Sequence, residues 1–240
     1  SYGKDLRDGT ELSGLLRALS TVPGDYWIRM FYCYPNSFTN EVLEVMASDP
    51  RFCRYLDMPF QHISDPVLKK MNRKITRKEI EATMARVRRK LPDVAWRTTF
   101  IVGFPTETDQ DFEELVDFVS EGHFQHLGIF LYSDEDNIRS SKFGDPIPIS
   151  LKEERKNRLM EIQQKISREH HQKMVGSLQQ VLVGGFSSET DLLLEGRNQY
   201  QGPEVDGVVY INEGNATSAG FHQVEITEAH EYDLVGKILN

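Results

Sequence analysis

The sequence of 240 residues contains only two cysteines and no long hydrophobic run. Two cysteines cannot form a disulfide framework, and they exclude an iron–sulfur or zinc site that needs three or four thiolates from this chain alone. No apolar stretch approaches the ~20 residues that cross a bilayer. P-loop and G-x-G-x-x-G patterns and a Ser-His-Asp order are also missing. The remaining composition, 39% hydrophobic and 27% charged, is that of an ordinary globular protein, for which the cytoplasm is the default compartment.

Basic residues are scarce in the last 67 residues, and this scarcity accounts for most of the net charge of −9. Residues 1–173 hold 26 Lys and Arg and 27 Asp and Glu, whereas residues 174–240 hold 2 and 10, a net charge of −8. An acidic segment repels phosphate backbones and suits a basic partner. Solubility alone also explains an excess of acid, so both interpretations stay open at this point.

The first 150 residues alternate between helix-like and strand-like segments. We expect helices at 8–19, 39–48, 64–72 and 109–121, and one that starts at 76. Thr76 and Glu79 have the spacing of a capping box. Strand-like runs occupy 26–34, 55–59, 96–102 and 127–132. Strands separated by helices predict parallel βαβ units, and four such strands leave an open sheet. The expected α/β fold is a partial TIM-like (β/α) barrel that lacks one or two N-terminal βα units.

A second capping-box pair, Ser150 and Glu153, predicts a long, highly charged helix that runs to about Val175. Glycines and short β-type runs follow it, at 178–183, 192–195, 208–211, 223–227 and 234–238. Five short strands predict a small five-stranded antiparallel β-barrel. We therefore divide the chain into a (β/α) barrel portion at 1–149, a connecting helix at 150–173 and a β-barrel domain at 174–240.

Functional groups of parallel α/β folds gather where strands end and loops begin. Gln61 and His62 follow one predicted strand, and Gly103 follows another. Arg97 and Thr99 alternate in phase on that second strand, so they share one face of the sheet. Each position also has a structural explanation: His62 as a hydrogen-bonded histidine, Gly103 as a turn residue and Arg97 as the partner of a carboxylate. The pattern alone does not decide between these interpretations.

In chain order, the sequence contains YGKDL at 2–6, WIR at 27–29, YLDMPFQH at 55–62, MNR at 71–73 and RTTFIVGFP at 97–105. As a set, these stretches resemble the motifs of the methylthiotransferase family of radical S-adenosylmethionine enzymes. Three later stretches are similar to the TRAM domain that closes those enzymes: GR at 196–197, QGPEVDG at 201–207 and YDLVG at 232–236. The resemblance covers essentially the whole chain in the family's order.

The family has a branch that modifies tRNA and a branch that modifies a ribosomal protein. Members of the first carry Gln-Ser-Gly-Ser where this chain has Gln61-His62-Ile63-Ser64. The Gln-His form resembles the second branch, which β-methylthiolates an aspartate of small-subunit ribosomal protein twelve. The acidic C-terminal segment agrees, because it suits a basic ribosomal protein better than tRNA. A tRNA methylthiotransferase and a non-catalytic ribosome-binding adaptor are the alternatives.

The resemblance implies S-adenosylmethionine and two [4Fe-4S] clusters as cofactors. It implies that Gln61, His62, Arg97, Thr99 and Gly103 line the S-adenosylmethionine pocket. No catalytic residue is assigned. No metal ligand is expected in this chain, because the family's Cys-x3-Cys-x2-Cys loop is missing. We therefore expect an N-terminally truncated chain that is inactive alone. The expected partner is small-subunit ribosomal protein twelve, docked on the acidic TRAM-like domain, with neither tRNA nor a membrane as partner.

Overall fold

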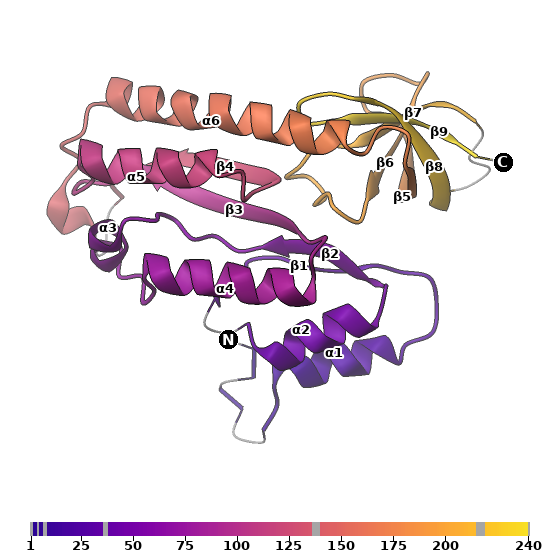
Figure 1. Cartoon of the computed structure of the whole chain (residues 1–240), viewed down its shortest axis with the longest axis horizontal. Helices are drawn as coiled ribbons and strands as arrows, with labels where there is room; N and C mark the ends of the chain where they lie inside the picture. The colour runs from indigo at the N-terminus through magenta and orange to yellow at the C-terminus, as the bar shows by residue number, and fades with distance from the viewer. Residues whose placement is uncertain are drawn as a thin grey trace.

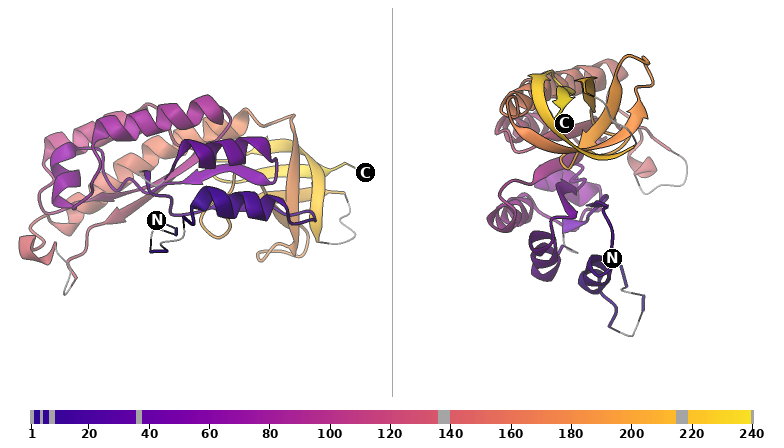
Figure 2. Two further views of the ribbon diagram at one scale, coloured as in Figure 1. Left: turned by 90° about the horizontal axis from the view of Figure 1, so that it is seen from below. Right: turned by 90° about the vertical axis from the view of Figure 1, so that its right-hand side faces the viewer.

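The computed structural model describes residues 2–3, 5–6, 9–35, 38–135, 140–214 and 219–239. A sheet domain and a small closed barrel are joined by one long helix, α6 (Ile149–Gln172), which runs along the sheet domain and ends at the barrel (Figure 1). Two further views agree that the barrel lies at one end of the sheet domain (Figure 2). In the described ranges, no helix is long and apolar enough to cross a membrane.

The sheet domain holds four parallel strands in the order β1-β2-β3-β4, as the sequence predicted. These strands are β1 (Ile28–Met30), β2 (Phe52–Asp57), β3 (Ala95–Val102) and β4 (His126–Leu131). The helices of this domain are α1 (Leu12–Ser20), α2 (Asn40–Ser48), α3 (Asp65–Lys70), α4 (Arg77–Lys90) and α5 (Asp109–Ser120), and a 3-10 turn, η2 (Ser141–Phe143), precedes α6. Within the described residues, β1 and β4 are the two edges of the sheet, so the sheet is open.

The first strand is much shorter than the aromatic run at 26–34 predicted. The chain leaves the sheet at Tyr32, whose backbone has a φ of 54°. Trp27, Phe31 and Tyr200 of the barrel domain pack against the same buried cluster, and the Trp27 ring contacts Phe221 of the barrel with 4.8 Å between centroids. The apolar character of this run thus reflects the contact between domains rather than a long strand. Asp8, where the first helix was expected to begin, lies outside the described residues, and α1 begins at Leu12.

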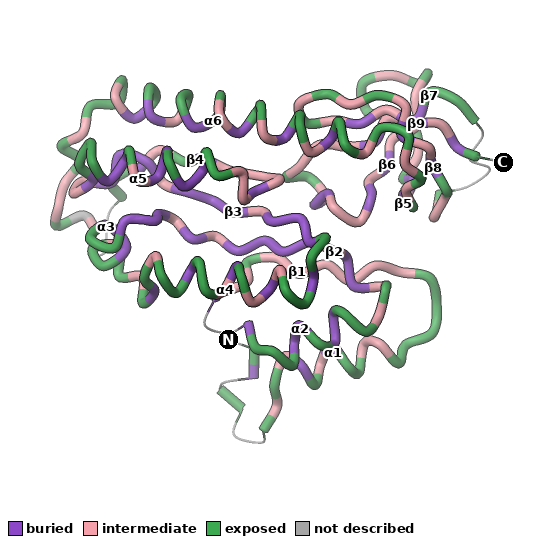
Figure 3. The backbone as a smooth tube through the Cα atoms, in the orientation of Figure 1, coloured by how far each residue is buried: buried purple, intermediate pink, exposed green. Residues whose placement is uncertain are grey.

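The central strand β3 separates two environments. Trp96, Thr98, Phe100 and Val102 are buried, and three of them belong to the main hydrophobic core shared with the helices. Arg97, Thr99 and Ile101 point to the other face, which carries the polar groups of the sheet. Figure 3 shows β3 as an almost continuous buried strand, as expected for a parallel sheet covered by helices.

Threonine side chains begin three of the helices. The hydroxyl of Thr39 accepts a hydrogen bond from the Val42 N–H at the start of α2. The predicted capping box of Thr76 and Glu79 at α4 is confirmed. A second box joins Thr108 to Asp111 at the start of α5 and was not predicted. Side chains that satisfy the first free N–H groups in this way set where each helix begins.

The capping box predicted from Ser150 and Glu153 is wrong. Helix α6 begins at Ile149 after Pro148, so Ser150 already lies within the first turn and caps nothing. The residue before the helix is Pro148, which has a fixed φ and no side-chain acceptor, so its side chain cannot cap the helix. The buried positions of α6 are mostly polar and recur every three or four residues: Lys152, Arg155, Leu159, Gln163, Ser167 and His171.

The C-terminal barrel closes in the order β5-β6-β7-β9-β8. Its strands are β5 (Leu178–Phe186), β6 (Leu194–Asn198), β7 (Val209–Glu213), β8 (Gly220–Ala229) and β9 (Leu234–Ile238). The number of strands was predicted, but the purely antiparallel pairing was wrong, since β7 and β9 are parallel. Strand direction can alternate all around a closed ring only when the number of strands is even, so five strands require one parallel pair.

The carboxylate of Asp206 anchors the barrel domain to the sheet. It accepts hydrogen bonds from the Tyr55 hydroxyl and from the Gly202 N–H, both at 2.7 Å. Its other oxygen lies 3.4 Å from Arg97 Nε and 3.5 Å from His126 Nδ1. The Asp206 side chain is only 2% exposed, so these contacts are shielded from water. One loop of the barrel domain thus binds β2, β3 and β4 together.

Candidate functional site

The carboxyl ends of β3 and β4 border a cavity of about 550 Å³, which we call the strand-end cavity. Its volume lies within the usual ~300–1,000 Å³ of small-molecule sites. Ligands of parallel α/β folds bind at this edge of the sheet. The side chains that line it include Gln61, Asn72, Arg73, Phe104, Tyr132 and Ser133. This cavity is therefore the candidate functional site.

Gln61 reaches the strand-end cavity from a left-handed backbone with a φ of 75°. Its N–H donates to the Thr99 carbonyl at 2.8 Å, and its own carbonyl accepts from the Ile101 N–H at 2.8 Å. These bonds pair Gln61 with β3 beyond the end of β2. A non-glycine residue in this region stores roughly 1 kcal/mol or more of strain, which the two bonds hold in place. The backbone of Gln61 is thus fixed at the edge of the cavity that its side chain lines.

Tyr132 gives the strand-end cavity a polar group in need of a partner. Its hydroxyl is buried and makes no hydrogen bond to any described residue. Its ring packs edge to face on Phe104, with 5.2 Å between centroids. Burial also lowers the pKa of the neighbouring Arg73 guanidinium. Because an unpaired buried hydroxyl costs free energy, the site favours a ligand that supplies a polar atom here.

His62 belongs to a buried network behind the cavity rather than to its lining. His62 Nδ1 accepts from the Ser64 N–H at 3.0 Å, and Nε2 lies 3.3 Å from a Glu107 oxygen. The other Glu107 oxygen accepts from Arg155 Nη1 at 2.9 Å and from the Gly103 N–H. Since Nδ1 accepts, the neutral ring carries its proton on Nε2 and donates to Glu107. The network ties the loop after β3 to helix α6.

Gly103 lies directly against the side chain of Lys152. Gly103 has a φ of 75°, and a Cβ built on it would lie 2.3 Å from Lys152 Cγ. The Lys152 ammonium donates to the Tyr132 carbonyl at 2.8 Å and to an Asp145 oxygen at 2.6 Å. The space that the glycine leaves is thus filled from α6, and the Lys152 head group contacts the backbone of a cavity residue.

Arg97 and Thr99 share one face of β3, as predicted, since both approach the open side of Gly128. Arg97 Nη1 donates to Asp57 at 3.0 Å, and Arg97 Nε faces Asp206. Both residues lie on the face of the sheet opposite the main hydrophobic core, and neither lines the strand-end cavity. Of the five expected cofactor contacts, the structure places only Gln61 in the lining of the cavity. Gly103 and His62 belong to the network behind it, and Arg97 lies further back along β3, level with the start of β4.

Comparisons with known proteins agree with both parts of the chain. The Radical SAM superfamily matches residues 5–119, and the TRAM domain matches residues 175–239. The whole chain is 42% identical to the ribosomal protein uS12 methylthiotransferase RimO of Geobacter sulfurreducens and covers 54% of that relative. Along its whole length, the chain is therefore similar to radical S-adenosylmethionine proteins named RimO.

Further relatives extend this finding. The chain is also 47% identical to the ribosomal protein uS12 methylthiotransferase RimO of Bdellovibrio bacteriovorus, over 99% of this chain and 53% of the relative. It spans about half the length of the curated relatives it matches. Its fold is similar to that of Escherichia coli coproporphyrinogen III oxidase, HemN, a radical SAM enzyme: the TM-score is 0.50 at 14% identity, over 78% of this chain and 50% of that chain. At this identity the likeness concerns the fold alone.

The matched Radical SAM superfamily implies S-adenosylmethionine and a [4Fe-4S] cluster, and the residues present fit only the first. The strand-end cavity offers a polar ligand the Gln61 side chain and the Tyr132 hydroxyl, which has no hydrogen-bond partner among the described residues. A cluster needs three or four thiolates, whereas burial raises the pKa of Cys33 to about 12 and that of Cys53 to about 11. The described residues also contain no group of three metal-binding side chains. The two thiols of this chain therefore do not fit the ligand set of a cluster.

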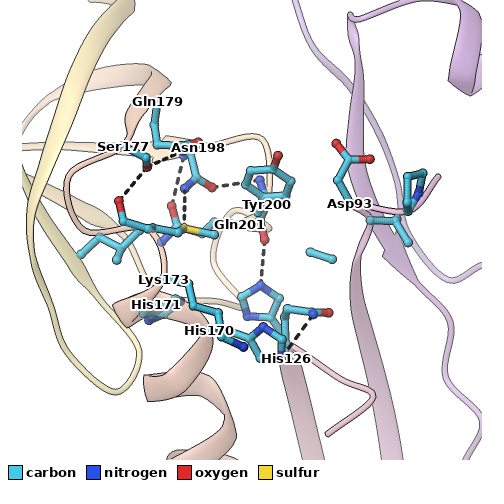
Figure 4. A pocket seen from close by; sticks show the side chains of 16 residues that line it. Asp93, His126, His170, His171, Lys173, Ser177, Gln179, Asn198, Tyr200 and Gln201 are labelled. Atoms are coloured by element: carbon cyan, nitrogen blue, oxygen red, sulfur yellow. Dashed lines mark hydrogen bonds between the residues drawn. The ribbon is translucent and has the colours of Figure 1, made fainter. Parts of the chain in front are cut away.

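A second cavity, of about 500 Å³, lies between the barrel and the sheet domain (Figure 4). Its lining includes His126, His170, His171 and Tyr200, and His126 Nε2 donates to the Tyr200 carbonyl at 2.7 Å. Burial lowers the pKa of both His170 and His171. The cavity borders the amino ends of β3 and β4, at the opposite edge from Gln61. We assign it to the packing of the two domains.

Sequence reasoning missed the residues that support the strand-end site from a distance. The sequence predicts Lys152 and Arg155 only as part of a long, highly charged helix, whereas the structure buries both. Their burial follows the spacing of three or four residues along one face of α6. A hydrophobicity pattern does not reveal this face, because most of its residues are polar. Asp206 carries no local signal of this role, since its partners in the sheet domain lie 80 or more residues away in the sequence.

Proposed function

We propose that the chain is the cofactor-binding and C-terminal part of a ribosomal protein methylthiotransferase that β-methylthiolates an aspartate of ribosomal protein uS12. The observation that carries this proposal is the match to RimO proteins along the whole chain, through the sheet domain and the barrel alike. Since its substrate would be a ribosomal protein, we place the activity in the cytoplasm.

In this proposal, S-adenosylmethionine binds at the strand-end cavity and supplies radical chemistry once it is bound. Gln61 and the Tyr132 hydroxyl hold polar atoms of the cofactor. His62 and Gly103 fix the loop after β3 through Glu107. We expect Arg97 and Thr99, which share one face of β3, to contact the bound cofactor from that face. Two [4Fe-4S] clusters belong to the proposal, with ligands outside these 240 residues, so we derive no step through them.

The acidic barrel is the docking surface in this proposal. Residues 174–240 have a net charge of −8. The exposed carboxylates of the barrel are Glu189, Asp191, Glu204, Glu213 and Glu228. A basic ribosomal protein is attracted to such a surface, whereas the phosphate backbone of tRNA is repelled.

The experiment titrates the chain against purified uS12 and, in parallel, against tRNA, at two salt concentrations. We expect uS12 to bind, with an affinity that falls as salt rises, and we expect the contacts to map to the barrel. Replacing the exposed barrel carboxylates with their amides should weaken this binding. Tight, steeply salt-dependent tRNA binding without uS12 binding would contradict the proposal and favour a tRNA methylthiotransferase.

A further inference from the structure

Tyr32 combines two features that rarely occur together. Its side chain is 79% exposed. Its backbone has a φ of 54°, in the left-handed region that bulky side chains avoid. The aromatic contact recorded for its ring is with Phe31, at 6.4 Å between centroids. The ring therefore gains little packing in return for a strained backbone.

The strained conformation of Tyr32 is held by a buried carboxylate. Asp57 accepts the Tyr32 N–H at 2.9 Å, and its other oxygen accepts from Arg97 at 3.0 Å. The next residue, Cys33, donates its N–H to the Asp57 carbonyl at 2.8 Å. Asp57 is fully buried, so water does not compete for these bonds. Residue 57 thus fixes two consecutive backbone positions and determines where the Tyr32 side chain points.

Strained backbones of this kind cost about 1–3 kcal/mol, persist only where their surroundings over-determine them, and cluster at binding and active sites. The exposed Tyr32 ring does not offset this cost through burial. A turn with no further role would be more stable with glycine at this position. The strain, with no packing to offset it, indicates that the Tyr32 ring is displayed for contact with another molecule.

The position of Tyr32 agrees with such a role. It follows β1 at the carboxyl edge of the sheet, the edge that also borders the strand-end cavity. Two residues later, Tyr34 is near enough to Arg73, which lines the cavity, to interact electrostatically with it. The segment that displays Tyr32 therefore continues to the rim of the cavity.

We propose that Tyr32 is a substrate-contacting residue whose ring receives a lysine or arginine side chain of the protein substrate. The identity of that substrate, uS12, rests on the function proposed above. The face of an aromatic ring attracts a cation, and the attraction is strongest for the ammonium and guanidinium groups that are abundant on a basic ribosomal protein. The fixed backbone lowers the entropy that the contact must overcome.

The test uses the complete, cluster-loaded gene product and compares Tyr32→Gly, Tyr32→Leu and Tyr32→Phe. The glycine variant removes strain and ring together, the leucine variant keeps an apolar side chain, and the phenylalanine variant keeps the aromatic face. We expect glycine and leucine to weaken uS12 binding about five-fold. Phenylalanine should keep the wild-type affinity. All three should keep the wild-type affinity for S-adenosylmethionine, and the melting temperature of the glycine variant should not fall.

Two results would overturn the inference while leaving the proposed function intact. Wild-type uS12 affinity in the glycine and leucine variants would show that the ring makes no contact. A lower melting temperature for Tyr32→Gly would show that the ring packs within the complete protein. If the unmodified protein binds tRNA instead of uS12, the proposed function fails first and the role of Tyr32 fails with it.

Discussion

The side chain of Lys152 occupies the space that a Cβ atom of Gly103 would need, with 2.3 Å between that ideal Cβ and Lys152 Cγ. Helix α6 therefore packs directly on the loop that follows β3. The Lys152 ammonium continues to the carbonyl of Tyr132 at the strand-end cavity. The connecting helix is thus a structural part of the candidate site as well as the link to the barrel.

Gly103→Ala should destabilise the chain by about 2–4 kcal/mol, because the methyl group meets Lys152 and the backbone has a φ of 75°. The measurement is the free energy of unfolding in urea. Gly122→Ala is the matched control, since Gly122 has a φ of 73° but nothing within 4 Å of its ideal Cβ. It should cost about 1 kcal/mol. Equal losses of unfolding free energy in the two variants would show that the Lys152 side chain moves aside at no cost.

Lys152→Met should destabilise the chain by about 2 kcal/mol, because methionine keeps the apolar stem but loses the bonds to Tyr132 and Asp145. Asp145 is one-third exposed, so water hydrates it once the ammonium is gone. Lys165→Met, at an exposed position of α6, should leave the unfolding free energy within about 0.5 kcal/mol of the wild type. Equal unfolding free energies for Lys152→Met and Lys165→Met would contradict this expectation.

Asp206→Ala should loosen the barrel from the sheet domain at a cost of about 3 kcal/mol, because it leaves Arg97 and the Tyr55 hydroxyl buried without this partner. Hydrogen exchange at the Gly202 amide, which donates to Asp206, should accelerate. Asp191→Ala removes an exposed carboxylate of the same domain and should change neither quantity. Unchanged exchange at Gly202 in Asp206→Ala would refute the anchoring role.

The stability of the chain should fall as the pH drops below about 6.5. Burial lowers the folded-state pKa of His170 and His171 from 6.5, so the unfolded chain binds more protons in this range. Their contribution is fully present above pH 6.5 and is lost as the pH falls towards the lowered values. Urea unfolding at pH 7.5 and 5.5 measures the difference. His171→Gln should reduce it, whereas His230→Gln, at a 56% exposed side chain, should not.

The sequence predicts those features that depend on neighbouring residues. The buried run of β3 and the Thr76 capping box follow from local patterns, and both are present. The parallel pair of β7 and β9 does not follow from the pattern of either strand, since it comes from closing a ring of five. Local patterns also miss the polar buried face of α6, because solvated helices carry the same residue types.

The candidate site likewise combines features that the local sequence predicts with features that depend on distant residues. Local patterns predict that Gln61 and Gly103 follow the ends of β2 and β3, and both residues lie there. What these positions contact depends on side chains distant in sequence: Lys152 fills the space at Gly103, and Asp206 binds Arg97 from the barrel domain. Such pairings arise only when the chain is folded, so composition and spacing do not reveal them.

The most direct test of the account is a transfer assay with both candidate substrates present. The complete gene product, with its clusters and S-adenosylmethionine, is incubated with purified uS12 and with tRNA, and both are examined by mass spectrometry. The account predicts a methylthio group on an aspartate of uS12 and unmodified tRNA. Methylthiolated tRNA with unmodified uS12 would contradict it.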